Sequence, residues 1–113
     1  MSIPISSELL DGCVLALLAD KDYYGYLITQ QIKQTITISE STLYPVLRRL
    51  KKNGALETYD QPYKGRNRRY YRITPAGTQR LAEIRLDWES YKHRVDWLLK
   101  KEGTENDDAS LLR

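Results

Sequence analysis

The 113-residue sequence contains no phenylalanine and only one cysteine. One cysteine cannot build a disulfide framework or a thiolate metal site within a single chain. Cys13 lies in the apolar run CVLALLA, where we expect it to pack as a small hydrophobic residue. That run is too short to span a membrane, and acidic Glu8 and Asp11 precede it where a signal peptide requires positive charge. The sequence therefore predicts a cytoplasmic protein without a membrane partner.

The sequence also lacks the residue sets on which most enzymes depend. His93 is its only histidine, and no glycine-rich phosphate loop precedes a predicted helix. The acidic residues are scattered without a metal-ligand spacing, and no nucleophile–base pair is visible. We therefore expect no catalytic residue, no metal, no cofactor and a protein that is not an enzyme.

Positive charge, in contrast, is concentrated in one segment. The net charge of the whole chain is only +3, but residues 48–72 carry nine Lys or Arg against two acidic residues, which gives +7. The rest of the chain is slightly acidic, at −4. This distribution indicates a polyanion-binding surface. The alternative is a solvated charged face that binds nothing.

Hydrophobic spacing and capping residues predict a mostly α-helical fold with a small β-hairpin. Three short helices joined by tight connections would form a trihelical core, and the last two resemble a helix-turn-helix. These helices are expected at residues 7–19, at about 25–35 and from Ser39 to Gly54, with a short loop at residues 21–25.

A basic hairpin and a long helix are expected to follow this core. Residues 56–59 and 70–73 are rich in β-formers, and the segment PYKGRNRR between them predicts a flexible tip carrying cations. Tyr70 and Tyr71 are expected to be structural, one on each face of the second strand. Thr74 caps the long helix with Pro75 at its first position, and the helix should run to about Glu102.

This order of elements is that of a winged helix-turn-helix. The segments YGYLI at 24–28, TLYPVLRRLKKNGAL at 42–56 and RRYYRITPAG at 68–77 resemble the three signature segments of the PadR family of bacterial transcriptional regulators. With the long final helix, the resemblance covers nearly the whole chain and is closest to the short-tailed members. It implies a homodimeric DNA-binding regulator and, with no activating region recognised, a repressor.

The third helix carries the candidate reading surface. Leu43, Val46, Leu47 and Leu50 recur at the spacing of one buried face, so the opposite stripe should be exposed. In helix-turn-helix proteins, the N-terminal residues of the second helix contact base edges in the major groove. The candidate DNA-binding residues on this helix and on the hairpin are Ser41, Thr42, Tyr44, Pro45, Arg48, Arg49, Lys52, Lys64, Arg66, Asn67 and Arg68.

Pro45 is the unusual member of this set, because proline lacks the backbone N–H that a helix interior uses. We hypothesise that Pro45 stiffens the reading end of the helix and offers an apolar contact to a thymine methyl group. A tolerated helix irregularity is the alternative. Arg48 and Lys52 lie farther along the helix and are expected to meet phosphates.

The long helix carries a heptad seam of apolar residues. Packing on the chain's own core would explain part of it, but a helix of nearly thirty residues, about 40 Å long, is longer than this small domain. The overhang favours a homodimer on a two-fold operator, which needs half-sites about one DNA turn apart. The predicted dimerisation residues are Leu81, Ile84, Trp88, Tyr91, Val95 and Leu98.

Trp88 and Tyr91 occupy successive seam positions. Multidrug-sensing relatives hold planar aromatic compounds between aromatic side chains of this helix, so the resemblance implies a planar aromatic or phenolic effector at Trp88 and Tyr91. A filled dimer core is the alternative.

The predicted organisation is a winged helix-turn-helix domain at residues 1–74, a C-terminal dimerisation helix at 75–102 and a disordered tail at 103–113. The function that fits best is a sequence-specific transcriptional regulator that binds double-stranded DNA. The alternative is a dimeric interaction module whose basic patch binds an acidic protein. RNA binding is disfavoured because the hairpin tip offers no stacking platform for unpaired bases except Tyr63.

Overall fold

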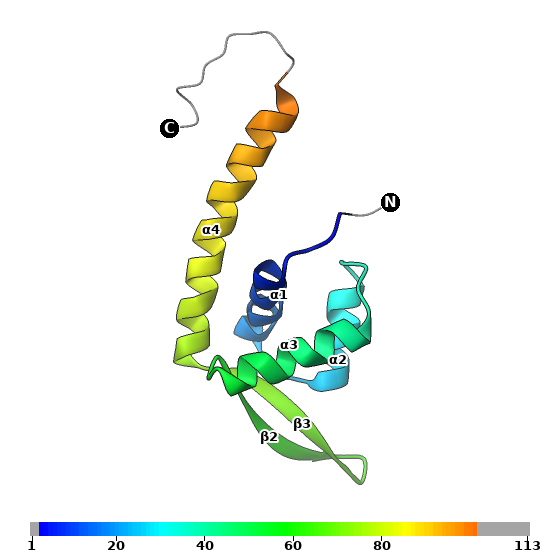
Figure 1. Cartoon of the computed structure of the whole chain (residues 1–113). Helices are drawn as coiled ribbons and strands as arrows, with labels where there is room; N and C mark the ends of the chain where they lie inside the picture. The colour runs from blue at the N-terminus through cyan, green and yellow to red at the C-terminus, as the bar shows by residue number, and fades with distance from the viewer. Residues whose placement is uncertain (1–2, 102–113) are drawn as a thin grey trace.

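The computed structural model describes residues 3–101, so the tail predicted at 103–113 lies outside the described residues. Figure 1 shows the shorter helices above a β-hairpin, with a long helix that runs beside the first helix and extends beyond it. This is a winged helix with a long C-terminal helix, as predicted. The elements are α1 (Ser7–Asp20), β1 (Tyr23–Tyr24), α2 (Gly25–Lys33), α3 (Glu40–Lys52), β2 (Leu56–Tyr63), β3 (Arg66–Ile73) and α4 (Pro75–Lys100).

The helices begin where their capping residues predict. The Ser6 hydroxyl accepts a hydrogen bond from the Leu9 amide at the start of α1. Ser39 caps α3 and Thr74 caps α4 in the same way, with Pro75 in the first turn of α4. Each hydroxyl satisfies a backbone N–H that has no partner inside its helix.

One hydrophobic core joins all four helices and the base of the hairpin. The predicted buried face of α3 is confirmed: Leu43, Val46, Leu47 and Leu50 are all buried. Cys13 is partly buried against this core, and burial raises the pKa of its thiol. The other buried apolar residues are Leu10, Val14, Leu15, Leu18, Ile28, Ile32, Ala55, Leu56, Leu81 and Ile84.

The hairpin, here called the wing, differs from the prediction. The two strands are eight residues long, and only Lys64 and Gly65 form the tip. Both have positive φ, at 52° and 79°, which is the requirement of a type I′ turn. The expected flexible loop at residues 62–69 is therefore wrong, because the strand pairing continues through Pro62–Asn67 to Tyr63–Arg66.

The loop expected at residues 21–25 is also wrong in part. Tyr23 and Tyr24 form β1, which pairs with Tyr71 and Tyr70 of β3 and makes a three-stranded antiparallel sheet in the order β1-β3-β2. Two residues are too few to show the alternating pattern that predicts a strand, so whether they form one depends on pairing with the neighbouring strand.

The start of α4 is attached to the base of the wing by a close backbone approach. The Thr74 amide donates to the Ala55 carbonyl at 3.1 Å, and the Thr74 hydroxyl donates to the Gly54 carbonyl at 2.6 Å. Gly77 leaves room for this contact: a Cβ atom there would lie 2.2 Å from the Ala55 carbonyl oxygen. The direction in which α4 leaves the domain therefore depends on a residue without a side chain at position 77.

We expect Gly77→Ala to lower the free energy of unfolding by about 2–3 kcal/mol, because backbone atoms would have to move to relieve the clash. Thr78→Ala, one position along on an exposed site, is the matched control and should stay within about 0.5 kcal/mol of the parent chain. Urea unfolding followed by circular dichroism measures both values. Equal stability of the two variants would show that the α4 junction is not tightly packed.

Candidate nucleic-acid interface

The exposed side of α3 has the composition that the sequence predicted. Ser41, Pro45, Arg48 and Lys52 are all exposed, on the side opposite the buried leucines. Pro45 lies inside the helix and leaves the Ser41 carbonyl without its helical hydrogen-bond partner. Ser41 is on the same solvent-exposed side. Within residues 3–101, neither Arg48 nor Lys52 forms an ion pair. Two cations are therefore available to an external anion.

Hydroxyl groups gather at the N-terminus of α3. The Ser39 oxygen accepts from the Thr42 amide and lies 3.0 Å from both the Ser41 and the Thr42 hydroxyl oxygens. Hydroxyls both donate and accept, and the N-terminus of a helix favours negative charge. This end of α3 can therefore hydrogen-bond base edges or phosphates.

Two of the predicted residues on α3 make contacts inside the fold. Arg49 forms an ion pair with Asp11, a buried carboxylate on α1, and also donates to the Ser7 hydroxyl at 3.4 Å. Tyr44 is half-buried against the core, with its ring close to Gly25. The structure therefore uses Arg49 to neutralise Asp11 and Tyr44 to join α3 to α2.

The wing separates its predicted residues in a similar way. Lys64, Arg66 and Asn67 are exposed at or beside the tip. The Arg68 guanidinium, in contrast, lies between the rings of Tyr24 and Tyr63, at 4.4 and 4.6 Å from their centroids. Such cation–π contacts hold the arginine on the sheet.

Tyr70 and Tyr71 point to opposite faces of the sheet, as predicted. Tyr70 stacks on Tyr59 at 5.5 Å on the face away from α3. Tyr71 faces α3: burial raises the pKa of its hydroxyl, whereas the nearby positive charges of Arg69 and Arg48 oppose that rise. Arg69 is not among the predicted DNA-binding residues. Because it follows Arg68 directly along a strand, its side chain points to the opposite face of the sheet from Arg68.

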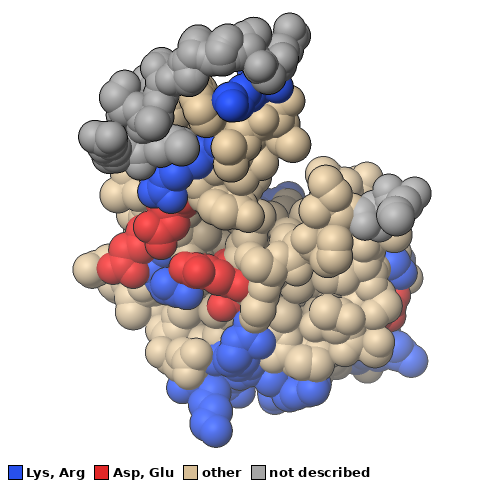
Figure 2. Space-filling model, turned by 45° about the horizontal axis from the view of Figure 1, so that its top comes forward, with Lys and Arg blue, Asp and Glu red and all other residues tan. Residues whose placement is uncertain are grey.

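Positive charge gathers where α3 and the wing meet. Figure 2 shows Lys and Arg side chains at that end of the molecule, and acidic side chains higher up on the side of α4. Among residues 3–101, no group of three His, Cys, Asp or Glu is arranged to hold a metal ion. No helix in that range has the length and apolar character needed to cross a bilayer.

The predicted seam on α4 divides into two parts. Leu81 and Ile84 are buried in the chain's own core, with Ile84 packed against Gly12 of α1. Beyond them Trp88, Tyr91 and Leu98 are exposed. The first two seam residues therefore attach α4 to its own domain, and only the later ones are free for another partner.

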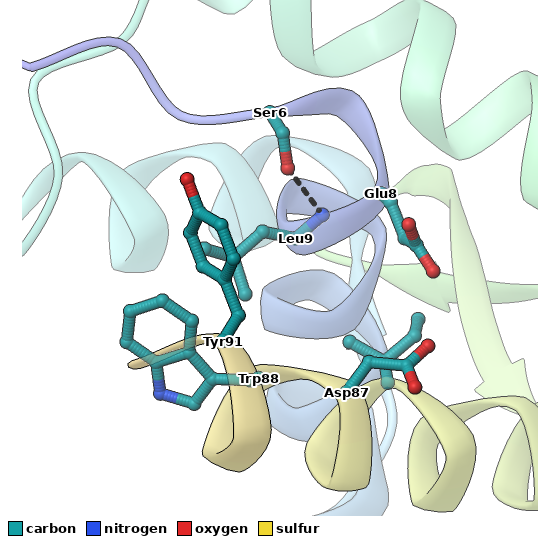
Figure 3. Close-up of a pocket in the computed structure, with 7 residues that line it drawn as sticks. Ser6, Glu8, Leu9, Asp87, Trp88 and Tyr91 are labelled. Atoms are coloured by element: carbon teal, nitrogen blue, oxygen red, sulfur yellow. Dashed lines mark hydrogen bonds between the residues drawn. The ribbon is translucent and has the colours of Figure 1, made fainter. Parts of the chain in front are cut away.

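A pocket of about 290 Å³ lies between α4 and the start of α1. Figure 3 shows Tyr91 extending from α4 toward Ser6 and Leu9, with Trp88 beside it. The Trp88 and Tyr91 rings lie 6.4 Å apart. The two predicted effector residues thus line one hollow, together with the carboxylates of Glu8 and Asp87.

Comparison with known proteins identifies relatives of this chain. The sequence model of the transcriptional regulator PadR-like family matches residues 14–83. The chain is 38% identical over 78 residues to transcriptional regulator Rv3488 of Mycobacterium tuberculosis, which covers 68% of this chain and 73% of that protein.

Solved structures agree with this match. The crystal structure of smu.1704 from Streptococcus mutans has a TM-score of 0.82 and 40% identity, and the match covers 96% of this chain and 100% of that one. The PadR-like transcriptional regulator BC4206 from Bacillus cereus has a TM-score of 0.76 and 30% identity over 83% of this chain and 94% of that one. Such proteins are transcriptional regulators and not enzymes. The chain therefore belongs to the PadR-like family and is a DNA-binding transcription regulator with a winged-helix fold.

Proposed function

We propose that this protein is a repressor that binds a two-fold operator as a homodimer and is released by a small planar effector. The observation that supports the DNA contact is the exposed stripe of α3 beside the wing. Hydroxyls, Pro45 and two cations that form no ion pair within residues 3–101 follow one another along it. In this proposal, α3 enters the major groove, as the second helix of a helix-turn-helix does.

Each side chain of this surface has a role that follows from its chemistry. Ser41, Thr42 and Pro45 at the N-terminal end of α3 read base edges and thymine methyl groups. The cations hold the protein on the backbone and make its affinity dependent on salt. The proposed phosphate contacts are Arg48 and Lys52 on α3 with Lys64 and Arg66 near the wing tip. Arg49, Arg68 and Tyr44 are left out of the contact set because they bind within the fold.

The exposed part of α4 supports the homodimer. A helix of 26 residues is about 39 Å long, and its later turns extend beyond the domain (Figure 1). Trp88, Tyr91 and Leu98 are 38%, 60% and 56% exposed, which is expensive for a seam of large apolar residues unless a second copy covers it. Two copies related by a two-fold axis present two α3 helices to successive major grooves. Repression then follows because the bound dimer excludes the polymerase from overlapping DNA.

The pocket at Trp88 and Tyr91 supports an effector. Two aromatic rings favour a flat ligand, and the carboxylates of Glu8 and Asp87 favour a positive charge on it. The pocket lies between the start of α1 and the proposed dimer seam. A ligand there would shift the angle between α4 and the winged domain, and with it the spacing of the two α3 helices.

The DNA contact is tested on α3. Arg48→Ala combined with Lys52→Ala should flatten the slope of log affinity against log salt by roughly two, one for each lost phosphate contact. Fluorescence anisotropy of a labelled duplex, from about 50 to 200 mM salt, measures the slope.

Arg49→Ala is the matched control for this test. It should keep the slope but lower the free energy of unfolding by about 1–3 kcal/mol, because Asp11 loses its partner. An unchanged slope in the double variant would remove α3 from the DNA. A parent chain without salt-dependent binding to any duplex would favour the acidic protein partner instead.

The dimer is tested on the free part of α4. Leu98→Asp places a charge in the proposed seam, where burial without a partner costs several kcal/mol, so the variant should sediment as a folded monomer. Leu86→Asp carries the same change on the other side of the helix, at a residue that is 72% exposed, and should remain dimeric. Sedimentation velocity distinguishes the two, and a dimeric Leu98→Asp variant would contradict this seam.

The effector is tested by fluorescence in a Trp97→Phe background, where Trp88 is the remaining tryptophan. Planar cationic dyes and uncharged phenolic compounds should quench Trp88 at micromolar concentrations and weaken operator binding. Tyr91→Ala should reduce the quenching at least fivefold because one wall of the pocket is lost. If no compound of either class changes the fluorescence or the DNA affinity, Trp88 and Tyr91 serve packing alone.

A further inference from the structure

The strand register gives the wing two chemically different faces. Cross-strand partners in an antiparallel pair point to the same side, and neighbours along a strand point to opposite sides. We define the inner face as the side of Tyr71, toward α3, and the outer face as the side of Tyr70. The inner face of β2 and β3 carries Leu56, Thr58, Asp60, Pro62, Asn67, Arg69, Tyr71 and Ile73, and the outer face carries Glu57, Tyr59, Gln61, Tyr63, Arg66, Arg68, Tyr70 and Arg72.

Most arginines on the outer face contact neighbouring side chains of the fold. Arg68 is held between two tyrosine rings, and the Arg72 guanidinium lies 4.6 Å from the centre of the Tyr59 ring. Arg72 also pairs with Asp22 at 3.4 Å and with Glu57 at 3.3 Å. These contacts stiffen the sheet but leave Arg68 and Arg72 little freedom to bind another partner.

The inner face continues the exposed surface of α3. The Tyr71 ring lies beside Gly25, and so does the ring of Tyr44 from α3. The positive charges of Arg48 and Arg69 both act on the Tyr71 hydroxyl. Arg69 therefore lies on the same side of the molecule as the α3 cations and extends their surface onto the wing.

Arg69 faces one carboxylate across the strand pair. Asp60 is its register partner, and the Arg69 Nε atom lies 3.2 Å from an Asp60 carboxylate oxygen. Both side chains are about half exposed. Within β2 and β3, Asp60 is the only acidic residue on the inner face. An exposed pair of this kind contributes little to stability, so the fold does not account for its presence.

We infer that Arg69 is a phosphate contact of the wing and that Asp60 is its internal competitor, a carboxylate that a DNA phosphate must displace from the guanidinium. This inference rests on the proposed DNA contact of α3. The Asp60 carboxylate accepts from the Arg69 Nε–H group, one of the donors that a phosphate oxygen would use, and its charge repels the phosphate backbone. Because every duplex carries phosphates, Asp60 lowers affinity for all sequences alike and leaves base reading to α3.

Asp60→Asn and its control Glu57→Gln test this inference. Both remove one carboxylate that pairs with an arginine across the same two strands, but on opposite faces. Anisotropy titrations with one labelled duplex at low salt measure both. Asp60→Asn should bind the duplex about fivefold more tightly, because Arg69 no longer pairs with a carboxylate and is free for a charge-assisted contact to a phosphate. Glu57→Gln should stay within about twofold, the effect of net charge alone.

Arg69→Gln completes a double-mutant cycle. Arg69→Gln should lower the salt slope by roughly one. In the Arg69→Gln background, adding Asp60→Asn should raise the affinity for the duplex by less than about twofold. Unfolding curves of all variants should match the parent chain, because both ion pairs are exposed.

An equal gain for Asp60→Asn and Glu57→Gln would overturn the inference, since net charge would then suffice. An unchanged duplex affinity for Asp60→Asn would overturn it as well. So would an increase for Asp60→Asn that is just as large when Arg69→Gln is also present. A parent chain that binds no duplex in a salt-dependent way is a different result, which refutes the proposed function itself.

Discussion

The burial of one face of α3 is the constraint on which the rest of the surface depends. Leu43, Leu47 and their neighbours are buried with almost no exposure, and truncating one such leucine typically costs about 2–5 kcal/mol. No other rotation of the helix about its axis satisfies this requirement. Since side chains on a helix are spaced at 100°, the same rotation directs Pro45 and Arg48 outward. The stripe that we propose faces DNA is thus the geometric complement of the core.

The cations of this small basic segment fall into two structural groups. Arg49 neutralises buried Asp11, and Arg68 lies between two tyrosine rings of the wing. Such contacts join α3 to α1 and stiffen the sheet, so these charges hold the surface in shape. Arg48 and Lys52 have no ion-pair partner within residues 3–101 and are the ones free to meet phosphates. Net charge alone does not distinguish the two groups.

The sequence predicted the helices well because their signals are local. Apolar spacing identified the buried face of α3, and Ser39 and Thr74 marked helix starts. The wing strands were predicted too short because the parts of β2 and β3 nearest the tip, DQPY and RNRR, contain polar, charged and turn-forming residues without the apolar alternation of a half-buried strand. The contact of Arg49 could not be predicted, since Asp11 lies 38 positions away. Likewise, spacing alone cannot tell that Ile84 is covered by α1 while Leu98 is exposed.

The central claim is that α3 and the wing read a two-fold DNA site from two copies of the chain. Selection of bound duplexes from a random pool, followed by sequencing, tests this directly. We expect enrichment of an inverted repeat whose half-sites are centred about 10 base pairs, or a multiple of that distance, apart. Enrichment of a single unrepeated element, or no enrichment over the starting pool, would contradict the claim.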